Sequence, residues 1–134
     1  CGAARIRVRL EAARGVDLRD RGGGADLYCV CGVAGRPASR FQTRGSVGSS
    51  AENPRWDHEQ EVAHHVPGDS LEFTLVDCLA LPQPDGQPGP CAVVGTSTLR
   101  SEQFYPHGFD AELTVWSAGL GIVGLVRVRV TVLE

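Results

Sequence analysis

The sequence predicts an all-β fold, a sandwich of two packed β-sheets, from three observations. Residues 5–12 and 126–132, near the two ends, alternate polar and apolar side chains with the period of two that is typical of a half-buried strand. Between them, turn-forming clusters divide the chain into short apolar runs, and the 134 residues include 17 Gly and 8 Pro. No long segment shows the periodicity of an amphipathic helix. About eight strands are therefore expected.

The first and last strands carry the clearest pattern. In the first, the outward face is expected to carry Arg5, Arg7 and Arg9, and in the last it is expected to carry Arg127 and Arg129. The inward positions of both strands are aliphatic: Ile6, Val8, Leu10, Val126, Val128, Val130 and Val132.

Further strands and one helical turn are expected between these two. The strands are expected at residues 26–33, 39–44, 58–66, 70–77, 92–99 and 112–116. Residues 101–105 can form the helical turn. Large aromatic side chains usually lie in the core, so Tyr28, Trp56, Phe73 and Trp116 are expected to be buried.

The charge balance and the apolar runs exclude two classes of protein. The chain has 13 basic residues, all Arg, against 16 acidic ones, which gives a net charge of −3. It lacks the basic field with which nucleic-acid-binding domains neutralise phosphates, so no nucleic-acid partner is expected. The longest run without charged or strongly polar residues, 118–126, is about half of the ~18–20 residues that cross a bilayer. Any membrane contact is therefore expected to be peripheral.

Length and cysteine content indicate the setting of the domain. The length fits one domain and the sequence contains no Met, so we expect residues 1–134 to be a single domain excised from a larger protein. Cys29 and Cys31 lie two apart in an expected strand, which is poor geometry for a bridge. A reducing, cytoplasmic location is the simpler interpretation of the five cysteines. Cys78 and Cys91 flank a loop and could pair in a secreted protein.

Four aspartates lie in or beside expected turns. Asp20 and Asp26 flank a triple glycine, Asp77 ends a strand, and Asp85 lies in the Pro-rich segment that follows. Calcium binds several carboxylate oxygens that converge from flexible loops, and loops at one end of a sandwich can provide them. Alternatively, each Asp caps its own turn, since Asp side chains commonly bond nearby backbone groups. The spacing alone leaves both interpretations open.

Several segments, taken in order, resemble the C2 domain, the calcium- and phospholipid-binding sandwich of protein kinase C, synaptotagmin and ferlin-type proteins. These segments are residues 7–20, 23–28, 40–43, 53–56, 71–77 and 93–95. The resemblance implies an eight-stranded antiparallel Greek-key β-sandwich whose loops at one end hold calcium. Because Glu11 and its two following alanines lie on the first strand, and an alternating Val and Arg strand closes the chain, it implies the phospholipase-type circular strand order.

Carried over residue by residue, the resemblance implies calcium ligands at Asp20, Asp26, Asp77 and Asp85. Three positions depart from the family pattern. Leu79 stands where the family has a further ligand, and Leu27 replaces a usual Pro. The third loop is long enough that Ala92 can take the place of Asp85 in the ligand pattern. Since each missing carboxylate weakens the site, at most one weakly held calcium ion is expected.

Two further features predict contact with lipid. A loop tip with Leu79 and Leu81 can insert into the interfacial layer of a membrane, or it can pack against the end of the sandwich. In the resembled fold the first and last strands are neighbours, with Arg40 or Arg44 on an adjacent strand. This arrangement gathers five arginines on one outer face: Arg5, Arg7, Arg9, Arg127 and Arg129. Guanidinium groups bind phosphate in bidentate fashion, although a charged strand face can equally be a solvated surface.

Other chemistry has little support in the sequence. His58, His64 and His65 lack a closed zinc-ligand spacing, and no nucleophile motif is present, so no enzymatic activity is expected. The sequence therefore predicts a cytoplasmic, peripheral membrane-targeting module that binds anionic phospholipid and one weakly held calcium ion. The alternative is a calcium-independent C2 domain that binds a protein partner.

Overall fold

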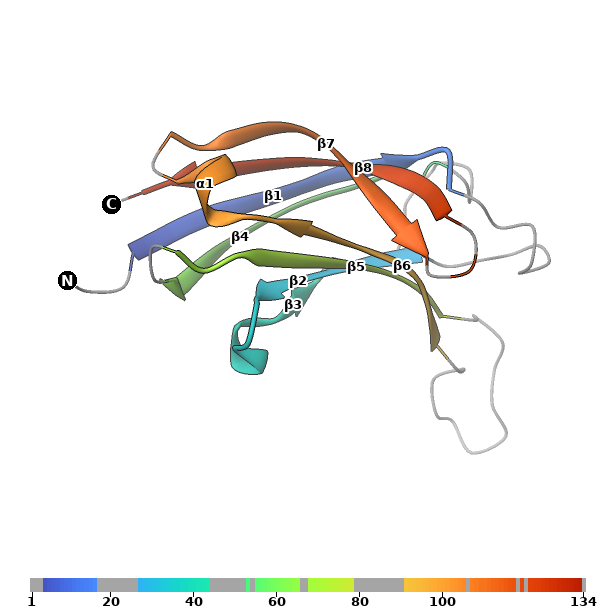
Figure 1. Ribbon diagram of the computed structural model, residues 1–134, viewed down its shortest axis with the longest axis horizontal. Helices are drawn as coiled ribbons and strands as arrows, with labels where there is room; N and C mark the ends of the chain where they lie inside the picture. The colour runs from blue at the N-terminus through green and yellow to red at the C-terminus, as the bar shows by residue number, and fades with distance from the viewer. Residues whose placement is uncertain are drawn as a thin grey trace.

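The computed structural model describes residues 4–16, 27–43, 53, 55–65, 68–78, 91–105, 107–117, 119 and 121–133. Within these ranges the chain forms eight β-strands, one 3-10 turn and one short α-helix (Figure 1). In chain order they are β1 (Ala4–Arg14), β2 (Leu27–Val33), η1 (Pro37–Ser39), β3 (Phe41–Gln42), β4 (Arg55–His65), β5 (Leu71–Cys78), β6 (Cys91–Leu99), α1 (Ser101–Phe104), β7 (Phe109–Ser117) and β8 (Gly121–Val132).

The strands form an antiparallel sandwich, as predicted. Their order is β3-β2-β5-β6-β7-β8-β1-β4. Strands β6 and β7 pair through one residue pair, Thr96 and Trp116, whereas the other long strands pair over most of their lengths. The ladder therefore folds over at this junction, and Figure 1 shows β7, β8, β1 and β4 facing the layer of β6, β5, β2 and β3. At the opposite edge, the rings of Phe41 in β3 and His58 in β4 stack with centroids 5.7 Å apart.

The first and last strands are neighbours, as the predicted circular strand order requires. Strand β1 lies between β8 and β4, with Ile6 opposite both Val132 and Val62. Strand β8 thus fills the middle of its sheet although it comes last in the sequence. Figure 1 shows both chain ends on the same side of the molecule.

The core lies between the two layers and is built from the inward positions of the alternating strands. Val128 and Leu10 are fully buried, and so are Ile6 and Val8, as the period of two predicts. The largest fully buried side chains in the described ranges are Phe73, Phe104, Ile6, Leu10, Leu27, Leu71, Leu75 and Leu99. These come from both sheets and from α1, so a single core holds the layers together.

The predicted core is wrong at two aromatic residues. Trp56 and Phe73 are buried as expected, but Tyr28 is only half-buried and Trp116 is 54% exposed. In β7 the inward positions are Leu113 and Val115, so the alternation directs the next residue outward. A register shift between Val115 and Trp116 marks the same point of the strand.

The predicted elements are present with altered bounds. Within the segment expected as a strand over 39–44, the structure has the last residue of η1 and the two-residue strand β3. The expected helical turn is α1. Arg40 precedes β3, which pairs with β2 at the far edge of the strand order from β1, so its expected place beside the β1 arginines was wrong. In the part of the chain that the structure covers, no helix has the length and apolar character needed to cross a bilayer.

Candidate functional site

One end of the sandwich gathers the strand ends that flank the predicted ligand loops. We call it the loop end. The strand register places these residues there: Arg14, Leu27, Arg55, Asp77, Cys78, Cys91, Ser117 and Gly121. The predicted calcium ligands and the predicted insertion residues belong to segments that enter or leave this end.

Side-chain hydrogen bonds join the strand stems at the loop end. The Gly15 N–H donates to Asn53 Oδ1 at 3.1 Å. The buried Trp56 Nε1–H, from β4, donates to the carbonyl oxygen of Leu27, at the start of β2, at 3.0 Å. The Cys29 N–H donates to Thr43 Oγ1 at 3.0 Å. The segment Asn53 to Trp56, which carries part of the family resemblance, therefore links stems from both sheets.

Asp77 is the predicted calcium ligand that the structure describes. It lies near the end of β5, opposite Leu27, and its residue is only 1% exposed. Leu27 directly follows Asp26 in the sequence, so the register brings the stem of one predicted ligand beside another. A buried carboxylate is stable only with hydrogen bonds, an ion pair or a metal ion, which makes its position informative.

The remaining predicted loop residues lie outside the described residues. These are Asp20, Asp26, Asp85, Leu79 and Leu81. Among the residues that the structure does describe, no three His, Cys, Asp or Glu side chains gather closely enough to hold a metal ion. The calcium ligand set therefore remains a prediction, with Asp77 as its described member.

The five predicted arginines lie on the outer face of β1 and β8. The register places Arg9 opposite Arg129, and Arg7 opposite Thr131. Carboxylates lie among them, mainly from the flanking strands. Arg5 contacts Glu61 of β4 at 3.1 Å. A face that the sequence presents as basic is therefore shared with acidic side chains.

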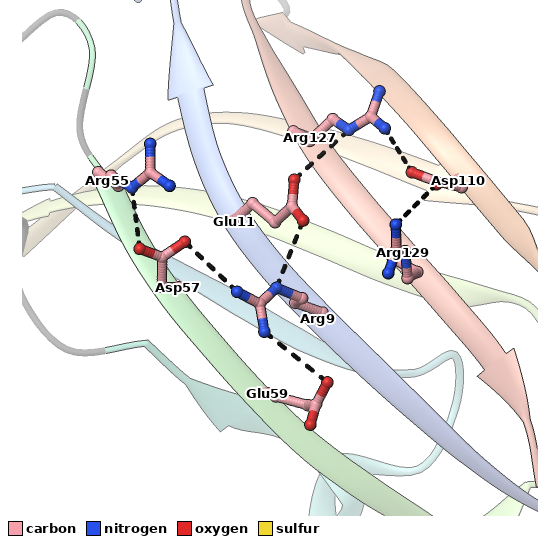
Figure 2. A network of polar contacts seen from close by, with 8 residues as sticks. All are labelled: Arg9, Glu11, Arg55, Asp57, Glu59, Asp110, Arg127 and Arg129. Carbon is pink, nitrogen blue, oxygen red and sulfur yellow. Dashed lines mark hydrogen bonds and ion pairs between the residues drawn. The ribbon is translucent and has the colours of Figure 1, made fainter.

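A continuous network of ion pairs crosses all four strands of this face, as Figure 2 shows. We call it the charge ladder. Its members are Arg55, Asp57 and Glu59 of β4, Arg9 and Glu11 of β1, Arg127 and Arg129 of β8, and Asp110 of β7. Arg9 contacts Glu11 at 3.3 Å and Asp57 at 3.7 Å, and Glu11 reaches Arg127 at 3.5 Å. The ladder contains equal numbers of arginines and acids, so it carries no net charge.

Two local features lie within the charge ladder or beside it. Asp57 adopts a left-handed backbone conformation, with φ of 49°, where β4 shifts register against β1 between Leu10 and Ala12. Asp tolerates this conformation better than most residues do. Nearby, Glu112 accepts two hydrogen bonds from Arg14, and these lower the pKa of the Glu112 carboxyl. Because both side chains are exposed, the pair contributes little to stability.

The acidic partners were missed from the sequence although a signal for them exists. Asp57, Glu59 and Glu61 recur at every second position of β4, so they share its outward face. Asp110 and Glu112 do the same in β7. The alternation gives the face of each strand but not which strands are neighbours, and only the neighbours determine the pairing.

Four of the five cysteines lie in strands and form two pairs of near neighbours, one within β2 and one across β5 and β6. Cys29 and Cys31 are free and fully buried. Burial raises the pKa of the Cys29 thiol to about 12, and burial together with the neighbouring Cys29 raises the pKa of the Cys31 thiol. Cys78 and Cys91 lie directly opposite each other in the β5–β6 ladder.

We expect the two pairs to differ in thiol chemistry. Iodoacetamide at pH 8 should leave Cys29 and Cys31 of the native protein unmodified, because they are protonated and buried. Opposed residues in antiparallel strands have Cα atoms about 4.5–5.5 Å apart, within the ~4.4–6.8 Å of disulfides. Glutathione disulfide should therefore oxidise Cys78 and Cys91 to one cystine, with release of two glutathione molecules. Peptide mass mapping checks both results, and a bridge at Cys29 instead would contradict them.

The strand order and the antiparallel pairing define the chain as an eight-stranded β-sandwich with a buried aspartate at its loop end. The family model described as "C2 domain" matches residues 4–110, and the chain belongs to the C2 domain family. C2 domains generally target membranes and bind phospholipids or proteins.

Solved structures show the same fold. A C2 domain of plant extended synaptotagmin 1 superposes with a TM-score of 0.75 at 19% identity, covering 98% of this chain and 95% of that one. Human GIVD cytosolic phospholipase A2 gives a TM-score of 0.72 at 15% identity, over 98% of this chain. The match spans only 16% of that phospholipase. No curated protein matches the chain in sequence.

Proposed function

We propose that the chain is a non-catalytic, cytoplasmic module that binds the anionic phospholipid surface of a membrane through its loop end. Asp20, Asp26, Asp77 and Asp85 would hold at most one calcium ion there, weakly. The observation that carries the proposal is Asp77, a carboxylate held at 1% exposure at the loop end, beside the stem that follows Asp26. The buried, free Cys29 and Cys31 fit a reducing compartment.

The chemistry of the predicted ligands suits calcium. Calcium prefers six to eight oxygen ligands, and carboxylates can be completed by backbone carbonyls and water. Three or four aspartates are enough for one ion but not for two closely spaced ions. A bound cation would also offset the aspartate charge at the surface that approaches anionic lipid.

The charge ladder favours the loop end over the arginine face as the lipid contact. Each of the predicted lipid-binding arginines lies within 4.0 Å of a carboxylate: Arg5, Arg7, Arg9, Arg127 and Arg129. A phosphate group would have to compete with these partners and would meet acidic side chains beside it. Binding of lipid by this face therefore remains the weaker part of the prediction.

Sedimentation with vesicles of phosphatidylserine and phosphatidylcholine tests the proposal. We expect the protein to sediment with these vesicles in millimolar calcium and to be released by a chelator. Asp77→Asn should abolish the calcium-dependent part because it removes a buried ligand charge. The matched control is Asp69→Asn. Asp69 lies between β4 and β5, at the end of the sandwich opposite the loop end, and its carboxylate pairs with Arg36 at 3.1 Å.

Other outcomes separate the proposal from its alternative. Sedimentation that is equal with and without calcium, and unchanged by Asp77→Asn, would reject the calcium site and keep lipid binding. A folded protein that never sediments would favour the calcium-independent protein-interaction module. The balanced charge ladder is the observation on which that alternative rests, because a neutral face of alternating charges suits a protein partner better than an anionic membrane.

A further inference from the structure

The hairpin of β7 and β8 presents an apolar pair at the loop end. Trp116 is 54% exposed and Ile122 is 58% exposed, and the two residues are cross-strand partners. We call them the hairpin pair. Solvent exposure of a Trp and an Ile side by side costs free energy in water, and folding alone does not explain it.

The outer face becomes less polar along the hairpin toward the loop end. The successive cross-strand pairs are Asp110 with Arg129, Glu112 with Arg127, Thr114 with Leu125, and Trp116 with Ile122. The sequence contains no charged residue between Glu112 and Arg127. On β7 and β8 the charged pairs therefore lie away from the loop end and the hairpin pair lies at it, whereas on β4 the charge ladder reaches the loop end through Arg55.

The hairpin pair is held on a rigid support. At Gly95 of β6, a Cβ atom would lie 2.8 Å from the carbonyl oxygen of Trp116 and 2.7 Å from Val115. The backbones of β6 and β7 therefore approach closely just below the pair. Val115 and Val123, which flank the pair along the two strands, are each 1% exposed and lie in the core. The two exposed side chains are therefore attached to strands whose adjacent residues are packed in the core.

We propose that the hairpin pair is a membrane anchor that enters the interfacial layer of an anionic bilayer beside the predicted ligand loops. This inference rests on the proposed function and adds a contact that the loops do not provide. Tryptophan favours the bilayer interface because its ring is apolar and its N–H is polar. The charged cross-strand pairs of β7 and β8, which lie farther from the loop end, remain in water behind the anchor.

The size of the hairpin pair favours a membrane over a protein occupant. A stable protein interface, including one between two copies of this chain, buries about 800 Å² on each partner. Two apolar side chains next to a charge ladder form a much smaller apolar patch. A bilayer requires no such area, because each inserted side chain adds independently to the contacts made by the loops.

Intrinsic fluorescence can observe the anchor directly, since the chain contains only 2 Trp residues. In Trp56→Phe, Trp116 is the sole tryptophan, and in Trp116→Phe the sole tryptophan is Trp56. With phosphatidylserine and phosphatidylcholine vesicles in calcium, we expect the emission of Trp56→Phe to shift to shorter wavelength and to be quenched by lipids with brominated acyl chains. Trp116→Phe should show neither change, because Trp56 is buried.

Affinity gives an independent readout. Trp116→Ser and Ile122→Ser should each weaken vesicle binding about tenfold. Trp116→Phe keeps an aromatic ring and should retain most of the affinity. The control Thr131→Ala changes an exposed residue toward the opposite end of β8 and should leave binding unchanged. If Trp56→Phe fails to fold, the difference between the spectra of the unsubstituted protein and Trp116→Phe supplies the same signal.

The outcomes distinguish the two proposals. If the protein sediments with vesicles while Trp116 emission and the affinity of Trp116→Ser stay unchanged, the anchor is rejected and the proposed function stands. If no vesicle binding occurs at all, both fail. If the protein self-associates without lipid and Trp116→Ser abolishes the association, a second copy covers the pair and the anchor is rejected.

Discussion

Replacing Trp56 by alanine is expected to lower the free energy of unfolding by about 3–5 kcal/mol. The side chain is only 8% exposed, and it belongs to β4 in one sheet. Its Nε1–H donates to the carbonyl oxygen of Leu27 in the other sheet, at 3.0 Å. Truncation therefore opens a cavity and also removes a hydrogen bond between the layers at the loop end. Urea denaturation followed by circular dichroism measures the change.

Two further variants divide the effect into its parts. Trp56→Phe keeps most of the packing and loses the donor, which should cost about 1 kcal/mol for the hydrogen bond. Trp116→Ala removes the same residue type from an exposed position and should change stability by less than about 0.5 kcal/mol. Equal costs at the two tryptophans would contradict the structure.

The two tryptophans show how far the sequence predicts this fold. The strand predicted over 112–116 includes Trp116, whereas the strand predicted over 58–66 begins two residues after Trp56, and the hydrophobicity of Trp predicts burial at both positions. Trp56 is buried, but Trp116 follows the inward-facing Val115 and a register shift, so its side chain faces outward. Residue type thus predicted burial at both positions, and this is confirmed only for Trp56. The face on which each side chain lies depends on the local register of its strand. The preference of large apolar side chains for the interior does not fix that register.

The arginine face illustrates a second limit. Period-two alternation correctly places Arg5, Arg7 and Arg9 on one face of β1. Their electrostatic role depends on β4, which is distant in sequence and supplies Glu59 and Glu61. A patch that looks basic along one strand is neutral once its neighbour is present. Arg40 was assigned to the wrong place for the same reason, since strand adjacency is a property of the whole topology.

The candidate site was predictable in one respect. Asp77 was identified from its position at a strand end and from the family resemblance, and the structure places it at the loop end, buried opposite Leu27. The stems that surround it are joined by Asn53 and Trp56, whose side chains reach across to other segments. A motif can be recognised in a sequence, but these hydrogen bonds between segments can be seen only in the folded structure.

Replacing Gly95 by alanine is expected to destabilise the protein by about 3 kcal/mol, as overpacking in a well-packed core does. A Cβ atom at this position would lie 2.8 Å from the backbone oxygen of Trp116, and 2.7 and 2.8 Å from side-chain carbons of Val115 and Val123. A side-chain carbon can move aside, but the backbone oxygen moves only if β6 and β7 separate. Thermal and urea denaturation measure the loss.

A second glycine provides the matched control for Gly95→Ala. Gly119 lies between β7 and β8, and no atom beyond its own residue and its two chain neighbours lies within 4 Å of the position that its Cβ would take, so Gly119→Ala should leave stability nearly unchanged. The variant Gly95→Ala with Val115→Ala removes one of the close contacts but not the one to the backbone oxygen. It should therefore recover little of the lost stability. Full recovery would show that side-chain crowding, and not the approach of the two strands, requires glycine here.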